Sequence, residues 1–241
     1  MHVLRDLRPS RTLVSLFVLV VVAALIPMSA LALASDSAGS APSLGAARSF
    51  AVLAGTAVTC TDSTVAGNVG VYPGVPITQT SCPVIGTING GNTVAAQASS
   101  DFLGAYDTFR ALPCDLSLAT LDGQTLSPGV YCFDSAATST GSVLTLDGPS
   151  NGLWIFKVGT LGTGALTGTN FTVVRKDGAP PSCNSVYWSV ADAVTMTDST
   201  LVGTVLSGAA ITLTRGTFNG NAYAKTGVTT TGAALTGCAL G

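Results

Sequence analysis

The chain has 241 residues, of which 28 are Gly and six are Cys, and only 9% of its side chains carry a charge. Twelve acidic and ten basic residues give a net charge of −2 at pH 7, and every acidic residue is Asp. Nucleic acids and anionic membranes are bound through clustered Lys and Arg, so this composition argues against both kinds of partner.

The first residues, 1–34, are predicted to be a secretory signal peptide. Arg5, Arg8 and Arg11 precede an apolar run of 14 residues from Leu13 to Ile26, and small residues at 32–34 provide a cleavage site. The apolar run is short for a membrane span, although an uncleaved anchor is the alternative. Removal of this segment leaves seven basic and eleven acidic residues, a net charge of −4, in an exported chain.

Residues 35–48 are rich in Ser, Ala, Gly and Pro and are predicted to form a flexible leader. Order is expected to begin near Phe50, so residues 49–241 are predicted to form a single domain. The first strands are expected at 50–55 and within the coil at 56–71, which ends at a Tyr-Pro-Gly turn. Residues 74–91, with their prolines and paired glycines, are predicted to be irregular.

One amphipathic helix of about 18 residues is predicted next, because apolar residues recur at steps of three and four. Either Asn92 or Thr93 can cap its start, and Pro113 ends it. The apolar stripe, which is expected to pack against the strands, consists of Val94, Ala98, Phe102, Ala105, Phe109 and Leu112.

Strands punctuated by Gly, Asp and Asn turns are predicted to resume after Pro113. They are expected at 125–133, 143–146, 153–158, 165–167 and 171–175. Trp154 and Trp188 lie in apolar segments and are predicted to be core residues.

The six cysteines indicate disulfides, because an even number of Cys is typical of an exported chain. Fifteen pairings are possible for six cysteines. Sequence proximity favours Cys60–Cys82 and Cys114–Cys132, which leaves Cys183–Cys238. The chain has no CxxC motif and its one histidine, His2, lies in the signal segment, so no metal or cofactor is predicted.

An internal repeat with a period of about 17 residues runs from Asp192 to Thr231. Ala193–Thr197, Ala210–Thr214 and Gly227–Thr231 each place an apolar residue before a Thr-x-Thr. Residues 57–64 match residues 193–200 at seven of eight positions. A unit this short cannot bury its own apolar side, so the repeat predicts an all-β solenoid of stacked coils.

Side chains alternate between the two faces of a strand, so inward Val194 and Met196 imply outward Thr195 and Thr197. The equivalent outward residues in the next two coils are Thr212, Thr214, Thr229 and Thr231. Strands about 4.8 Å apart would then present a regular grid of hydroxyls and methyls. Asp198 and Arg215 are one repeat apart and are predicted to stack on neighbouring coils. Asp62 and Asp198 lie at equivalent positions of their repeats and are predicted to form Asx-turns.

Seven short motifs follow one another along the whole predicted mature chain. They are Phe50-Ala-Val-Leu-Ala-Gly55, Gly67-Asn-Val-Gly-Val-Tyr-Pro-Gly74, Ala95-Ala-Gln-Ala98, Ala105-Tyr-Asp107, Ser127-Pro-Gly-Val-Tyr131, Trp154-Ile-Phe-Lys157 and Ala210-Ile-Thr-Leu-Thr214. In these motifs and their order the chain resembles the ice-binding proteins of the DUF3494 type. The resemblance implies a discontinuous right-handed β-helix of triangular section, with one long α-helix packed alongside. It also implies that the N-terminal coil stacks on the C-terminal coils, so that Thr59 and Thr61 extend the grid.

Some members of that family carry a Thr-(Ala/Gly)-x-(Thr/Asn) pattern on the ice-binding side. Thr167-Gly-Thr-Asn170 fits it, whereas the segments that begin at Thr61, Thr197 and Thr214 depart from it at the second position. The predicted ice-binding set combines the outward Thr-x-Thr pairs with the last residue of each of the segments that begin at Thr61, Thr197 and Thr214. The set is Thr59, Thr61, Thr64, Thr195, Thr197, Thr200, Thr212, Thr214, Thr217, Thr229 and Thr231.

The resemblance therefore implies a secreted, monomeric, non-enzymatic protein whose partner is the surface of an ice crystal. The alternatives are a β-helix enzyme that acts on polysaccharide and a passive adhesin module. An enzyme of that kind needs convergent carboxylates, and the Asp residues here are dispersed along the sequence.

Overall fold

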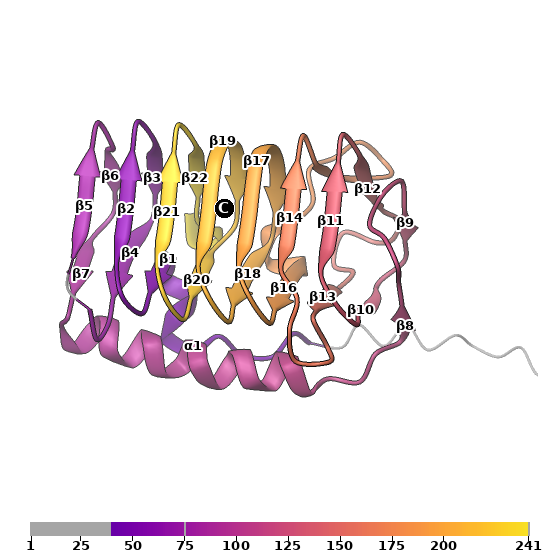
Figure 1. The fold of residues 1–241 in the computed structure, drawn as a ribbon, viewed down its shortest axis with the longest axis horizontal. Coiled ribbons are helices and arrows are strands. Elements are labelled where there is room, and N and C mark those ends of the chain that lie inside the picture. Colours follow the sequence, from indigo (N-terminus) through magenta and orange to yellow (C-terminus); the bar gives the residue numbers. More distant parts are fainter. Residues whose placement is uncertain (1–39, 75, 241) are drawn as a thin grey trace, which may run out of the picture. The chain divides into compact units, whose positions relative to one another are not determined.

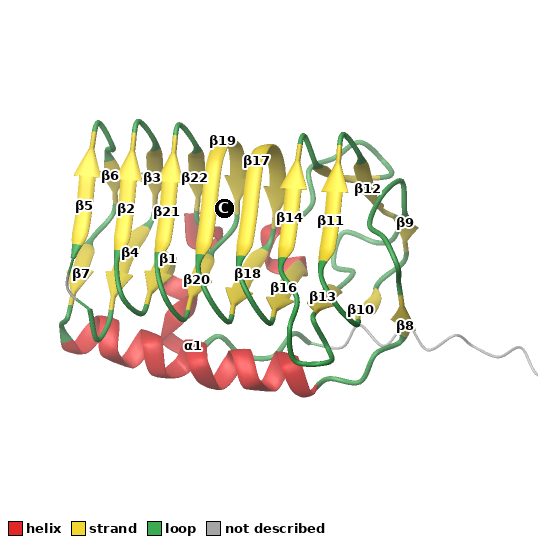
Figure 2. Cartoon of the chain, in the orientation of Figure 1, coloured by secondary structure: helices red, strands yellow, loops and turns green. Residues whose placement is uncertain are grey.

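The computed structural model describes residues 40–74 and 76–240, all within the compact unit that spans Ser37–Gly241. The predicted signal peptide, residues 1–34, lies outside the described residues. Within them, parallel strands wind into a solenoid with three faces, and the helix α1 (Thr93–Ala111) runs along one of these faces (Figures 1 and 2). Short 3₁₀ helices are η1 (Gly45–Ser49), η2 (Cys183–Ser185) and η3 (Cys238–Leu240).

The face that α1 covers, called the helix face below, is a nine-stranded parallel sheet. Its strands are, in spatial order, β7 (Ile88–Gly90), β4 (Asn68–Val71), β1 (Phe50–Ala54), β20 (Ala222–Ala224), β18 (Thr204–Ser207), β16 (Val186–Val190), β13 (Trp154–Val158), β10 (Gly129–Phe133) and β8 (Leu116–Ser117).

The other two faces belong to one 13-stranded sheet that bends at a corner in every coil. The threonine face, in front in Figure 1, contains β5 (Ile77–Thr80), β2 (Val58–Thr61), β21 (Val228–Thr231), the first halves of β19 (Ile211–Asn219) and β17 (Val194–Val202), β14 (Leu166–Thr169) and β11 (Ala137–Thr140). The third face contains β6 (Val84–Ile85), β3 (Thr64–Ala66), β22 (Ala234–Thr236), the second halves of β19 and β17, β15 (Thr172–Arg175), β12 (Val143–Leu146) and β9 (Thr125–Leu126).

The stacking order of the coils is discontinuous in sequence. Strand β1 pairs with β20, β2 with β21 and β3 with β22, so the first coil of the chain stacks directly on the last. The predicted fold class, a discontinuous β-solenoid with one long helix alongside, is confirmed.

The solenoid interior is filled by apolar side chains stacked in register. Val58, Val228, Ile211 and Val194 form one continuous inward column, and all four are buried. Trp154 and Trp188 are core residues as predicted, and the Trp188 ring stacks on Phe156 with centroids 4.2 Å apart. Each indole N–H donates to a backbone carbonyl, so neither ring buries an unsatisfied donor.

Helix α1 starts at Thr93 because the Asn92 side chain accepts a hydrogen bond from the Ala95 N–H at 2.9 Å. Its apolar side packs against Leu53, Ile155, Tyr187, Leu206 and Tyr223 on the helix face. Including Val94 in the apolar stripe was wrong: Val94 is 55% exposed, and Ala95 takes the buried position instead. No helix within residues 40–74 and 76–240 is long and apolar enough to span a bilayer.

Two cations hold the C-terminal end of α1 to the solenoid. The Arg110 guanidinium donates to the Val158 carbonyl at 2.8 Å, and the Lys157 ammonium donates to the Leu112 carbonyl. Lys157 is only 5% exposed, and burial, followed by the neighbouring Arg110, lowers its pKa. Positive charge at this end of the helix is favoured because the helix macrodipole is negative there.

Two expectations about order along the chain were wrong. The segment before Phe50 is not a flexible leader throughout: η1 buries Ala47, and the Ala46 N–H donates to the Asp101 carboxylate at 2.7 Å. Residues 35–39 lie outside the described part of the chain. The segment 74–91 is not irregular, since β5, β6 and β7 form a further coil. The Cys60–Cys82 disulfide, together with Ile77 and Val84, packs this coil against the core.

All three disulfides favoured by sequence proximity are present: Cys60–Cys82, Cys114–Cys132 and Cys183–Cys238. The first lies inside the end coil, and the second joins the segment after α1 to β10. The third joins η2 to η3 over the buried Val202.

We expect replacement of both Cys183 and Cys238 by Ala to lower the free energy of unfolding by about 2–5 kcal/mol. The bond closes a loop of 55 residues, so its removal frees the unfolded chain. Calorimetric melting of the variant beside the oxidised parent checks this. Detection of six free thiols by mass mapping of the native protein would contradict the disulfide assignment.

Candidate functional site

Two columns of threonine run without interruption across the threonine face. Register pairing aligns the first column as Thr78, Thr59, Thr229, Thr212, Thr195, Thr167 and Thr138. The second column, two residues further along each strand, is Thr80, Thr61, Thr231, Thr214, Thr197, Thr169 and Thr140. Every coil of this face therefore contributes an outward Thr-x-Thr.

The spacing of this grid follows from the sheet. Neighbouring strands lie about 4.8 Å apart, and side chains i and i+2 are about 6.7 Å apart along a strand. All fourteen threonines are half-buried or exposed, and no charged residue interrupts either column. Within the described residues none of their hydroxyls hydrogen-bonds to another protein group, so these hydroxyls remain free to bind water.

The sharp corner after the second column requires a left-handed backbone in every coil. The corner residues are Ser81, Asp62, Gly232, Arg215, Asp198, Asn170 and Gly141, with φ between 48° and 62°. A residue with positive φ turns the chain abruptly and ends the threonine face at one line. Asp62 and Asp198 occupy equivalent corners as predicted, but the prediction that they form Asx-turns was wrong. The side-chain hydrogen bonds of these turns come from the next residue: Ser63 donates to the Thr61 carbonyl and Ser199 to the Thr197 carbonyl, both at 2.8 Å.

This corner divides the predicted site residues between two faces. Thr59, Thr61, Thr195, Thr197, Thr212, Thr214, Thr229 and Thr231 lie together on the threonine face. Thr64, Thr200 and Thr217 lie around the corner, where they begin the third face, and Thr217 donates to the Thr200 hydroxyl at 3.3 Å.

Sequence reasoning did not assign Thr78, Thr80, Thr138 and Thr140 to the grid, nor Thr167 and Thr169 as an outward pair. Each pair is a Thr-x-Thr, so a search for that pattern outside the 17-residue repeat would have found them. A second outer face around Val202, Thr204, Asn219 and Asn221 is not formed. Val202, Thr204 and Asn221 are buried next to the Cys183–Cys238 disulfide, and only Asn219 is exposed.

Asp198 and Arg215 stack on neighbouring coils as predicted. Arg215 Nε donates to Asp198 Oδ1 and an Nη donates to Oδ2, both at 2.6 Å. The hydrogen bond from Arg215 lowers the pKa of Asp198 below its ordinary value, so the carboxylate stays charged at neutral pH.

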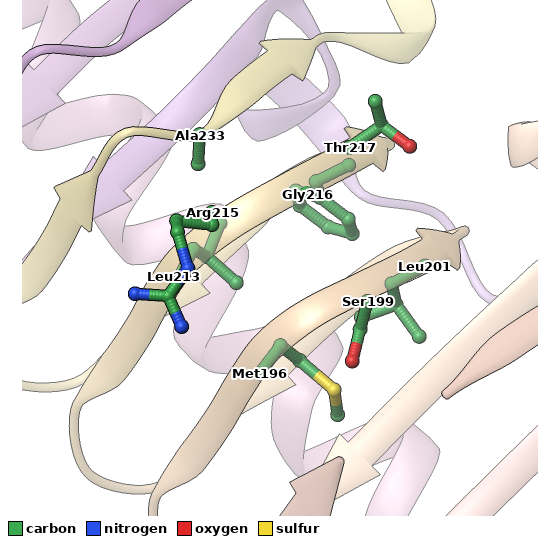
Figure 3. A pocket seen from close by; sticks show the side chains of 9 residues that line it. Met196, Ser199, Leu201, Leu213, Arg215, Gly216, Thr217 and Ala233 are labelled. Atoms are coloured by element: carbon green, nitrogen blue, oxygen red, sulfur yellow. The ribbon is translucent and has the colours of Figure 1, made fainter. Parts of the chain in front are cut away.

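The cavity beneath the corner of the grid is too small for a substrate. The cavity under the corner, between β17 and β19, has a volume of about 10 Å³ and is lined mainly by Met196, Leu201, Leu213 and Phe218 (Figure 3). That volume holds one water molecule at most. Among the described residues no three His, Cys, Asp or Glu side chains are grouped to hold a metal ion. The site is an extended surface.

The fold and the family of the chain can be identified by comparison with known proteins. The stacked, in-register parallel coils with one helix alongside place the chain in the class of β-solenoid proteins. Residues 52–236 match the sequence model of the Ice-binding-like family, and the chain belongs to that family.

Individual relatives agree with this assignment. An ice-binding protein of Nostoc sp. is 38% identical over 186 residues, which cover 74% of this chain and 66% of that protein. One from Typhula ishikariensis is 32% identical over 217 residues, covering 78% and 86%. The crystal structure of an ice-binding protein from Antarctomyces psychrotrophicus superposes with a TM-score of 0.74 at 32% identity, covering 81% of this chain and 98% of that one.

We expect Thr230→Val to raise the free energy of unfolding by about 1 kcal/mol. Thr230 points inward between the outward Thr229 and Thr231, is 1% exposed, and its hydroxyl has no hydrogen-bond partner among the described residues. Valine has nearly the same shape and removes the unsatisfied group. Denaturant unfolding measures the change, and a lower stability would show that the hydroxyl has a partner such as buried water.

Proposed function

We propose that this protein adsorbs to ice through the threonine face and so inhibits the growth and recrystallisation of ice. The observation that carries the proposal is the pair of unbroken seven-residue threonine columns. The names of the relatives support the ligand, since those proteins are called ice-binding proteins.

The chemistry of threonine suits this role. Each outward side chain offers a methyl group, which orders nearby water without competing strongly for it, and a hydroxyl, which can donate or accept. In-register β-strands hold these groups at spacings close to repeats of the ice lattice. Water ordered on such a surface can merge with the crystal, and growth between adsorbed molecules becomes curved and slow.

Three finer features belong to the same proposal. The segment at 1–34 would direct export, and the disulfides suit an oxidising, extracellular location. The protein would act as a monomer, because the end coil has short edge strands flanked by Pro76 and Pro83, which discourage edge pairing. It would not be an enzyme, because a polysaccharide-cleaving site needs carboxylates that converge. Asp62 and Asp198 lie at the same corner of different coils, with the coils of Gly232 and Arg215 between them.

Thr64, Thr200 and Thr217 are proposed to contact ice only at the margin of the site. They lie on the third face, beyond the corner, so they are not part of the two columns. We assign the main contact to the fourteen threonines of the columns.

We expect Thr212→Tyr to abolish most ice-shaping activity while leaving stability within about 0.5 kcal/mol of the parent. Thr212 lies at the centre of the first column, and a tyrosine ring there would hold the face away from a planar crystal. Freezing-point depression and crystal shape in a supercooled droplet provide the measurement.

The matched control is Thr236→Tyr, which adds the same ring at an exposed position of β22 on the third face. This variant should shape ice as the parent does. Full activity of Thr212→Tyr, or equal loss in both variants, would show that the threonine face is not the contact surface.

A further inference from the structure

Among the seven corner residues that the structure describes, Arg215 alone has a long basic side chain. It follows Thr214 directly in β19, and its side chain is 59% exposed. The six other corner residues are Ser81, Asp62, Gly232, Asp198, Asn170 and Gly141, all with shorter side chains. A free arginine at this place can extend over Thr214 and its neighbours in the second column.

The structure holds Arg215 away from those threonines. Both of its hydrogen bonds go to Asp198 on the preceding coil, and the bidentate geometry fixes the plane of the guanidinium. These two hydrogen bonds join Arg215 in β19 to Asp198 in β17. On the other side, the Arg215 stem lies beside Gly232, with its Cγ 3.4 Å from the place that an ideal Cβ would occupy there.

A mobile guanidinium on this surface would interfere with a flat ligand in two ways. It would add bulk above a plane of methyl and hydroxyl groups. It also carries a full charge, whose hydration shell must be removed before the face can meet a crystal of neutral water.

We infer that Asp198 is a positioning residue for ice binding: it holds Arg215 along the corner and thereby keeps the second threonine column open to the crystal. This inference rests on the proposed function. It assigns to the ion pair a role in access to the surface rather than in the stability of the coil.

The test is a cycle of single and double substitutions. Asp198→Asn keeps the shape of the side chain but removes the charge that holds Arg215. Arg215→Gly removes the guanidinium and places at the corner a residue that the chain already uses at Gly232 and Gly141 with φ of 62° and 60°. The matched control is Asp62→Asn. Asp62 occupies the equivalent corner position, but the corner residue beside it on the next coil is Gly232, so this substitution frees no arginine.

We expect Asp198→Asn alone to lose freezing-point depression at equal protein concentration. If the freed guanidinium covers the second column in about half of the molecules, the apparent affinity for ice falls about twofold. Arg215→Gly and the double variant Asp198→Asn/Arg215→Gly should retain the activity of the parent, as should Asp62→Asn. Thermal unfolding should be the same for the parent and all four variants, which separates access to the face from folding.

Two results would overturn the inference while leaving the proposed function intact. One is parental activity of Asp198→Asn in an assay in which Thr212→Tyr is inactive. The other is equal loss in Asp198→Asn and the double variant, which would show that Asp198 itself contacts ice. Failure of the parent protein to shape ice would instead contradict the proposed function.

Discussion

The in-register parallel pairing of successive coils is the constraint on which the rest of this structure depends. Because each residue lies above its equivalent in the next coil, inward Val194, Ile211 and Val228 form a core column, while the threonines beside them form outward columns. A slip of one residue would exchange the two sets and place hydroxyls in the core. The same pairing that buries the apolar side chains therefore also builds the surface grid, and stability and surface order have one origin.

Much of the fold could be predicted from the sequence, because the strongest local signals are repeated. The 17-residue period around Ile211 and Leu213, the alternating burial on either side of them and the helical stripe through Phe102 and Phe109 all reflect apolar side chains that must face a core. The likeness of residues 57–64 to 193–200 also pointed to coils that share one stack. Family resemblance supplied the discontinuous order, which local patterns alone do not encode.

The parts that sequence reasoning missed lack those signals. The coil at 77–90 carries the exposed Gln79 in the column where β19 and β17 place the buried Leu213 and Met196. In β11 the inward residues are the small Ala137 and Ser139. Solenoid ends have only one neighbour to pack against, so their apolar pattern is weak even though their outward Thr-x-Thr is intact. Contacts between residues far apart in the sequence do not produce a periodic pattern. One example is the hydrogen bond from the Ala46 N–H to the Asp101 carboxylate, which orders residues before Phe50.

The junction between the first and last coils has a consequence for how the chain folds. Most solenoids can grow from a local nucleus by adding one repeat at a time. Here Val52 pairs with Ala222, so the coil made first during synthesis lacks one of its stacking neighbours until nearly the whole chain has emerged. Closing contacts of such high sequence separation slow folding and couple both ends of the polypeptide into a single cooperative unit. Deletion of the last coil would therefore open the middle of the stack rather than shorten it.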